Sequence, residues 1–229
     1  MSERFAIYYA PSANSPLWDR AVAWLGRDPL GSQPFDGAIA GIERNRLLNL
    51  TQSANRYGFH ATLKPPMALA PGMSAEDLRA ALAEFARQHQ PVPLGRLEVG
   101  LIGGFLALLP VEQSEAVTDF AAHVVEHFEP FRAPLTLKDR AARLAKGLTP
   151  RQEELLDAYG YPYVFDEFRF HMTLTDRLPE GEREEIKAAA QAWFAPDLVE
   201  PVLLDRLVLF HEPEAGTLFR RLEDFRLGA

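Results

Sequence analysis

The chain has 229 residues, 47% of them hydrophobic and 24% charged, with a formal net charge of −8. This composition is typical of an ordinary globular protein. The excess of acidic residues argues against binding of long nucleic acid through an extended basic surface. Cysteine is absent, which excludes disulfides, thiolate metal sites and a cysteine nucleophile. The apolar runs are short and the start lacks a leader pattern, so we expect no membrane partner and a cytoplasmic location.

The first half reads as alternating strands and helices. Aromatic and β-favouring residues indicate the first strand, a Ser-x-x-Asp pattern at Ser74 indicates a capped helix, and a 3.6-residue apolar period indicates another helix after it. In chain order we expect a strand at 3–11, a helix at 15–26, a loop-rich segment at 27–55, a strand at 56–66, a helix at 74–88, two strands within 95–110 and a helix at 114–131.

The second half repeats this order after a polar, basic segment at 132–148. We expect a helix at 149–160, a strand at 168–178, a helix at about 180–194, a strand at 201–212 and a closing strand at 217–227. The repetition suggests duplication. It predicts a single bilobal domain spanning 1–229, with lobes at roughly 1–131 and 149–229, and leaves open an exchange of strands between them.

A short motif occurs in each half: residues 56–66 read RYGFHATLKPP and residues 168–178 read FRFHMTLTDRL. Side chains two residues apart on a strand point to the same face. In the first copy, His60, Thr62 and Lys64 would therefore share a polar face, opposite an apolar face suited to packing on helices.

In the second copy, Arg169, His171 and Thr173 would share a face in the same way. If a pseudo-twofold axis relates the halves, the two polar faces meet across a groove. Two histidines with ordinary pKa values of about 6.5 can act there as general acid and general base, one in each role. The threonine hydroxyls suit phosphate oxygens, and Lys64 and Arg169 would offset negative charge. The opening of a cyclic phosphodiester needs this arrangement and requires no metal.

These paired motifs resemble those of the two-histidine (2H) phosphoesterase superfamily, which includes RNA cyclic phosphodiesterases and bacterial RNA 2′–5′ ligase-like proteins. The full motif strings, the start RFAIYYAP and the length resemble one uncharacterised bacterial branch, associated with phosphonate-utilisation operons. The resemblance implies that His60 and His171 are acid/base residues and that Thr62 and Thr173 bind phosphate. It also implies an α+β fold of duplicated βαββ-type lobes, with mainly antiparallel sheets around a central cleft, and no required cofactor.

A second pattern, HVVEH, places His123, Glu126 and His127 as in one class of zinc peptidase. The apolar period of this helix turns His123 away from the core, which favours a solvated helix face over a walled zinc site.

The sequence therefore predicts a metal-independent 2H-type cyclic phosphodiesterase. Its substrate would be a small phosphorylated molecule, either a nucleoside 2′,3′-cyclic phosphate or a ribose cyclic phosphate. A non-catalytic nucleotide or phosphosugar binder and a zinc hydrolase are the alternatives.

Overall fold

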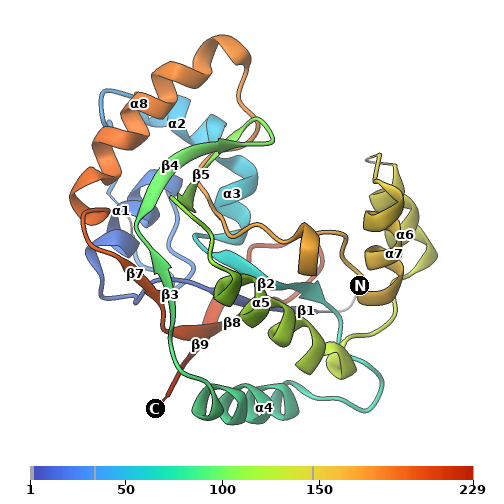
Figure 1. Cartoon of the computed structure of the whole chain (residues 1–229). Helices are drawn as coiled ribbons and strands as arrows, with labels where there is room; N and C mark the ends of the chain where they lie inside the picture. The colour runs from blue at the N-terminus through green and yellow to red at the C-terminus, as the bar shows by residue number, and fades with distance from the viewer. Residues whose placement is uncertain (1–2, 34, 146, 229) are drawn as a thin grey trace.

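The computed structural model describes residues 3–33, 35–145 and 147–228 (Figure 1). The strands are β1 (Arg4–Tyr9), β2 (Ala61–Met67), β3 (Val92–Gly95), β4 (Leu97–Ile102), β5 (Phe105–Pro110), β6 (Met172–Thr173), β7 (Val202–Leu204), β8 (Arg206–Glu212) and β9 (Arg220–Arg226). The helices are α1 (Pro16–Leu25), α2 (Arg44–Leu50), α3 (Gln52–Tyr57), α4 (Ala75–Gln88), α5 (Glu115–His127), α6 (Leu137–Leu144), α7 (Pro150–Tyr159) and α8 (Arg183–Phe194). Short 3₁₀ turns lie at Glu129–Phe131, Phe165–Glu167, Glu180–Glu182 and Ala195–Asp197.

The strands form three sheets, in the orders β2-β1-β8-β9, β4-β5-β6 and β3-β7. All the pairs within these sheets are antiparallel, so the predicted α+β class with mainly antiparallel sheets is confirmed. Each sheet combines strands from the first and the second half of the chain. The division into two lobes at 1–131 and 149–229 stays a prediction.

Local signals explain where several helices begin and end. The Ser15 hydroxyl accepts a hydrogen bond from the Trp18 amide at the start of α1, and Gly26 ends that helix in the left-handed conformation at φ 79°. The Ser74 and Asp77 side chains form the predicted capping box of α4. These contacts satisfy backbone groups that the first and last turns of a helix leave unpaired.

The prediction of a loop-rich segment at 27–55 is only partly right, because its second half forms α2 and α3. All the prolines and glycines of the segment precede residue 42, so nothing in 42–57 opposes helix formation. Leu47 is fully buried, and the Thr51 hydroxyl donates to the Leu47 carbonyl at 3.0 Å. The helices are thus stabilised by packing that a local reading does not include.

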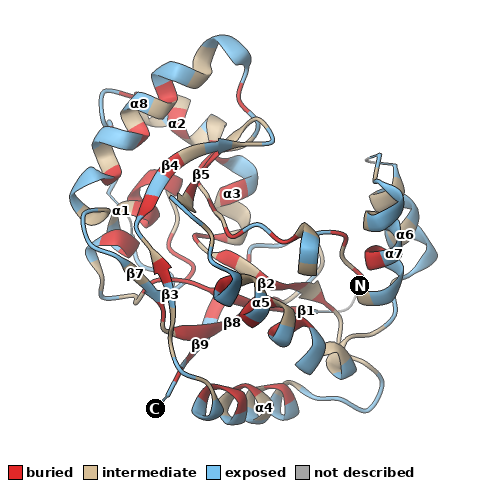
Figure 2. Cartoon of the chain, viewed as in Figure 1, coloured by how far each residue is buried: buried red, intermediate tan, exposed pale blue. Residues whose placement is uncertain are grey.

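The main core lies between the sheets and the inner faces of the helices (Figure 2). Helix α4 packs on β8 and β9, α5 packs on β2, and α8 packs on β4. The Trp24 indole, at the end of α1, donates to the Leu174 carbonyl at 2.9 Å and so joins α1 to the segment after β6. No helix of the described residues has both the length and the apolar character needed to cross a bilayer.

Helices α6 and α7 stand apart from the main core (Figure 1). A small second core of Val125, Leu155 and Val164 holds α7 against α5. Helix α6 buries none of its residues, and its Arg140 pairs with Asp157 on α7. The position of α6 therefore depends on polar contacts.

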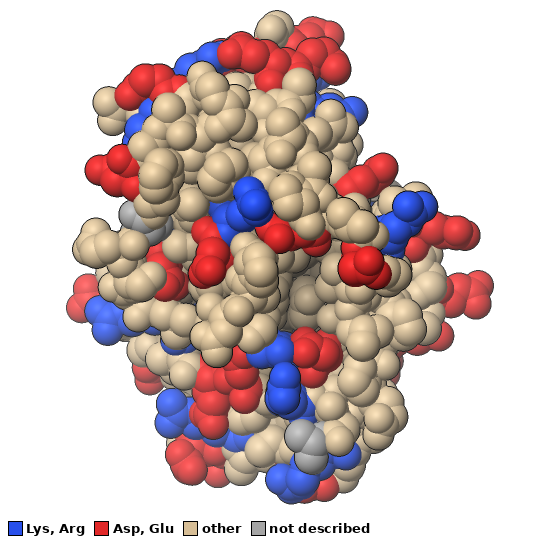
Figure 3. Space-filling view, turned by 90° about the vertical axis from the view of Figure 1, so that its left-hand side faces the viewer, with Lys and Arg blue, Asp and Glu red and all other residues tan. Residues whose placement is uncertain are grey.

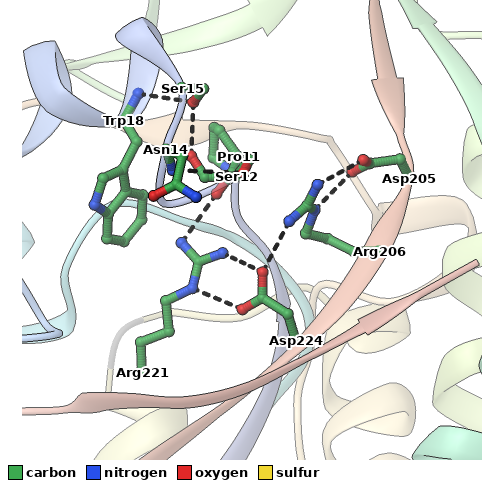
Figure 4. A network of polar contacts seen from close by, with 9 residues as sticks. All are labelled: Pro11, Ser12, Asn14, Ser15, Trp18, Asp205, Arg206, Arg221 and Asp224. Carbon is green, nitrogen blue, oxygen red and sulfur yellow. Dashed lines mark hydrogen bonds and ion pairs between the residues drawn. The ribbon is translucent and has the colours of Figure 1, made fainter.

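A polar network built on two buried arginines, Arg206 and Arg221, joins β8, β9 and the loop after β1 (Figure 4). Arg221 is almost fully buried and donates to both carboxylate oxygens of Asp224, at 2.9 and 2.6 Å. Its third donor reaches the Pro11 carbonyl at 2.9 Å, and its guanidinium carbon lies 4.4 Å from the ring centroid of Trp18. Arg206 donates to Asp224 from the neighbouring strand at 2.9 Å. One guanidinium thus links a strand, a loop and a helix.

Replacing Arg221 with alanine should lower the free energy of unfolding by about 3 kcal/mol, because it removes the hydrogen bonds of a buried guanidinium to Asp224 and to the Pro11 carbonyl, and its packing against Trp18. Chemical denaturation would measure the change. Arg87→Ala is the matched control, because Arg87 pairs with Glu84 on the exposed face of α4. It should cost less than about 1 kcal/mol. Equal effects of the two substitutions would contradict the structural role of Arg221.

Candidate active site

The first motif places His60 immediately before β2, in a ring position fixed by three contacts. Its Nδ1 lies 2.8 Å from the Gly58 carbonyl, which can only accept, so Nδ1 carries the proton. The ring stacks on Tyr8 of β1 with centroids 3.7 Å apart. The Thr62 hydroxyl donates to Nε2 at 3.3 Å. Nε2 thus keeps the lone pair that can accept a proton.

Gly58 permits this arrangement. Its φ of 83° lies in the left-handed region, and a Cβ at this position would collide with the Pro29 ring. The chain can therefore leave α3 and turn its carbonyl toward the His60 ring within two residues.

The second motif repeats the same hydrogen bond. Nδ1 of His171 donates to the carbonyl of Arg169, two residues earlier, at 2.7 Å. The ring lies 5.7 Å from that of Phe105 on β5, measured between centroids. The expected strand at 168–178 is reduced to the two residues of β6, which pair with Ala107 and Leu108. His171 therefore lies immediately before the first residue of its strand, as His60 does.

Both motifs open onto one cavity of about 340 Å³, lined by His60, Thr62, His171 and Thr173. The first two come from β2 and its preceding residue in the four-stranded sheet, and the last two from β6 and its preceding residue in the three-stranded sheet. The cavity lies within the size range of small-molecule sites. The fold thus brings all four motif residues together across two sheets.

The electrostatics of the cavity keep both imidazoles neutral near pH 7. Burial lowers the pKa of His60 to about 4, and repulsion from His171 adds to that effect. Burial also lowers the pKa of His171 from its ordinary value of 6.5. With Nδ1 donating to a carbonyl in each ring, both Nε2 atoms present lone pairs. A bound anion would favour protonation of either ring.

Lys64 does not line this cavity. Its ammonium donates to the Glu129 carboxylate and to the Val125 carbonyl, both at 2.8 Å, and its side chain is 1% exposed. The reason is a β-bulge: Thr62 pairs with Tyr8, whereas Lys64 pairs with Ile7, so one residue of β2 is extra. The strict alternation assumed from the sequence therefore fails after Thr62, and Lys64 points to the opposite face.

Arg169 lies beside the site and outside this cavity. Its guanidinium donates to the carbonyls of Asp166 and Phe168 at 3.0 and 2.7 Å. It lines an adjoining cavity of about 540 Å³, which shares Thr62 and His171 with the first. Arg169 can therefore meet a ligand that extends from the histidines into this second cavity.

The 340 Å³ cavity that holds both histidines is also lined by two cationic side chains that the motifs did not indicate, Arg4 and Arg143. Tyr57, Tyr161 and Tyr163 line it as well. Arg4 lies four residues before Tyr8 on β1, so the two-residue period of a strand could have placed it on the same face as Tyr8. Arg143 comes from α6 and carries no comparable signal, because only the tertiary structure brings α6 to the site.

The zinc alternative has no complete ligand set. His123 and His127 are exposed on α5, and their ring centroids lie 6.4 Å apart. Among residues 3–33, 35–145 and 147–228, no group of three or more histidine, aspartate or glutamate side chains is placed to hold a metal ion. The two rings instead pack edge-on against Phe85 of α4.

The molecular surface does not carry its charge in one patch on the face drawn in Figure 3. Acidic and basic side chains lie side by side there, although the chain has a net charge of −8. The absence of a long nucleic-acid partner stays a prediction.

Comparison with curated proteins finds relatives for nearly the whole chain. It is 37% identical over 221 residues to "Ribose 1,5-bisphosphate phosphokinase PhnN" of Janthinobacterium sp. (strain Marseille), which covers 94% of this chain and 49% of the relative. It is also 37% identical over 219 residues to the protein of the same name in Laribacter hongkongensis (strain HLHK9), covering 95% and 50%. The chain thus spans about half the length of these relatives.

Among solved structures, the chain is similar to a crystal structure of a phosphoesterase, with 14% identity, a TM-score of 0.41 and 99% of both chains covered. It is similar to E. coli LigT complexed with 3′-AMP, with 14% identity, a TM-score of 0.43 and 100% of both chains covered.

A family model matches residues 62–220 and carries the description "Protein of unknown function (DUF1045)". The matched range holds Thr62, His171 and Thr173, and it begins two residues after His60. The match takes in well over half of the chain. The chain therefore belongs to the DUF1045 family, in agreement with its resemblance to an uncharacterised bacterial branch.

Proposed function

We propose that this chain is a metal-independent phosphoesterase that opens a small cyclic phosphodiester, with His60 and His171 transferring the protons. One observation supports this above all others: two imidazoles from two different sheets line one cavity, and each is held through Nδ1 by the carbonyl two residues before it. This arrangement leaves both Nε2 atoms unprotonated and able to exchange a proton with a ligand that displaces the Thr62 hydroxyl from Nε2 of His60.

In the proposed reaction, water attacks phosphorus in line with the ester oxygen that leaves. One histidine takes a proton from the water as the new P–O bond forms, and the other gives a proton to the leaving oxygen as the ring P–O bond breaks. The product is a phosphomonoester with a free hydroxyl. Thr173 would donate a hydrogen bond to a non-bridging oxygen, where charge develops, and Thr62 would do the same once its hydroxyl turns from Nε2 of His60 to the ligand.

The pKa values favour one assignment of the two roles. His60, with a pKa of about 4, is unprotonated over the whole neutral range and is ready to act as base. Burial also lowers the pKa of His171, but a neutral His60 does not repel the proton that His171 takes up. His171 is therefore the ring that we assign as general acid, and a phosphate anion beside it would favour its protonated form.

The substrate we propose is a nucleoside 2′,3′-cyclic phosphate or a ribose cyclic phosphate. The names of the curated relatives refer to a phosphorylated ribose, which supports the second choice. The phosphokinase activity in those names belongs to proteins about twice as long. The present sequence contains no Gly-Lys pair and hence no G-x-x-x-x-G-K-[ST] loop for ATP phosphates. We assign phosphoester hydrolysis, rather than phosphoryl transfer from ATP, to this chain.

Replacing His60 or His171 with alanine should lower turnover of a cyclic phosphodiester by about 10²–10⁴-fold, because each substitution removes one proton-transfer group. The measurement is hydrolysis of a panel of nucleoside 2′,3′-cyclic phosphates and ribose cyclic phosphates with a chelator present. His123→Ala is the matched control, since its imidazole is exposed on α5.

Chelator-resistant turnover that needs His60 and His171 but not His123 would support the proposal. Turnover that needs His123 and is lost with chelator would favour the zinc hydrolase. Binding of the same compounds without hydrolysis, unaffected by either histidine substitution, would favour a binding protein.

The pH dependence of kcat/KM should be a bell whose maximum lies on the acid side of pH 6.5. The acidic limb follows protonation of His60, whose pKa is about 4. The alkaline limb follows deprotonation of His171, whose pKa is below 6.5. Exchanging the acid and base roles leaves these limbs unchanged, because either assignment requires the form in which the two histidines together hold one proton. A maximum on the alkaline side of pH 6.5 would contradict the proposed pair.

A further inference from the structure

Two arginines from distant parts of the chain line the cavity that holds the motif histidines. Arg4 comes from β1 and Arg143 from α6, and both lie along the same 340 Å³ space as His60 and His171. The proposed hydrolysis uses neither of them. Two guanidinium groups in one small cavity repel each other, so their presence requires an explanation.

Arg4 is held in place by a buried carboxylate. Its Nε donates to Glu212 at 2.5 Å, and the Glu212 side chain is fully buried. Glu212 also pairs with Arg56 and accepts from the Gly216 amide at 2.9 Å. Among the described residues, Arg4 uses only Nε in hydrogen bonds, so both terminal nitrogens remain for a ligand.

Arg143 has no carboxylate partner within the described part of the chain. One terminal nitrogen donates to the Gly160 carbonyl, and the guanidinium carbon lies 5.7 Å from the ring centroid of Tyr161. Burial lowers the pKa of Arg143, and repulsion from Arg4 acts in the same direction. The guanidinium is thus partly desolvated without an ion pair, which is costly unless an anion binds.

The charges near this end of the cavity do not cancel. Arg4, Arg56 and Arg143 carry three positive charges, and Glu212 is the single carboxylate that these three arginines contact among the described residues. Asp139 on α6 acts on Arg143 from farther away. Positive charge thus remains in excess here, in a chain whose net charge is −8. A phosphomonoester dianion carries the complementary charge, and its oxygens match the forked donors of arginine.

We propose that Arg4 and Arg143 form a second anion subsite, which binds a phosphomonoester group on the same small molecule whose cyclic phosphodiester lies between the histidines. The substrate class is then a small cyclic phosphodiester, of ribose or a nucleoside, that carries a second phosphate. The nature of the reacting end rests on the proposed function; the second subsite rests on the two arginines alone. Tyr57 and Tyr161 form walls of the same cavity and suit the sugar between the two anions.

The test compares matched substrates with and without the second phosphate. The pairs are ribose 1,2-cyclic phosphate and its 5-phosphate, and adenosine 2′,3′-cyclic phosphate and its 5′-phosphate. We expect kcat/KM to be about 10- to 100-fold higher for the doubly phosphorylated member of at least one pair, the range of charge-assisted hydrogen bonds. Hydrolysis with equal kcat/KM within both pairs would overturn the subsite.

Arg143→Ala should remove most of this preference, because kcat/KM should fall about 10- to 100-fold further for the doubly phosphorylated compound than for the singly phosphorylated one. Lys138→Ala is the matched control, because it removes one positive charge from an exposed position on the same helix. Arg143→Ala acting equally on both members of a pair would show a general role and contradict the subsite. Arg143→Lys should keep part of the preference, since an ammonium retains the charge but not the fork.

A binding measurement separates failure of the subsite from failure of the proposed function. Calorimetry with adenosine 3′,5′-bisphosphate and adenosine 3′-monophosphate needs no turnover. Tighter binding of the bisphosphate that depends on Arg143, in a protein that hydrolyses none of the cyclic compounds, would uphold the subsite and reject the hydrolase. Hydrolysis without a preference in either assay would uphold the hydrolase and reject the subsite.

Discussion

The pairing of β1 with both β2 and β8 is the constraint on which the rest of the structure depends. Tyr8 lies opposite Thr62 on one side and Val208 on the other, and the strand is buried from Phe5 to Tyr9. This pairing joins the start of the chain to its end. It also places the Tyr8 ring beneath His60. The backbone hydrogen bonds of one strand thus assemble the four-stranded sheet and one half of the site.

Burial gives the site its chemistry. The carbonyls that hold Nδ1 of His60 and His171 orient each ring, and desolvation lowers the pKa of each below its ordinary value. The same cavity contains Arg4 and Arg143, whose charges burial does not remove. Neutral rings beside uncompensated guanidinium groups suit an anionic ligand, because the anion offsets positive charge and favours a protonated imidazole. An acidic chain thus contains a locally cationic cavity.

Several features were accessible from the sequence because they depend on local physics. The capping pattern at Ser74 and the apolar period of 114–131 predicted α4 and α5. The two-residue period of a strand put His60 and Thr62 on one face, and both line the cavity. Such signals hold where nearby residues alone decide conformation. The same period misplaced Lys64, because the bulge in β2 depends on how β1 pairs with it.

The sequence by itself determined most element positions and the two histidine motifs, since caps and apolar periods are local properties, and the resemblance that these motifs carry implied the fold class. The tertiary structure alone decided which distant residues share the cavity. In the folded chain Lys64 is buried and pairs with Glu129 instead of lining the cavity. Arg143 lines the cavity although it comes from α6, a helix that buries none of its residues. Pairing between strands and docking between helices are non-local, and no single segment of the sequence encodes them.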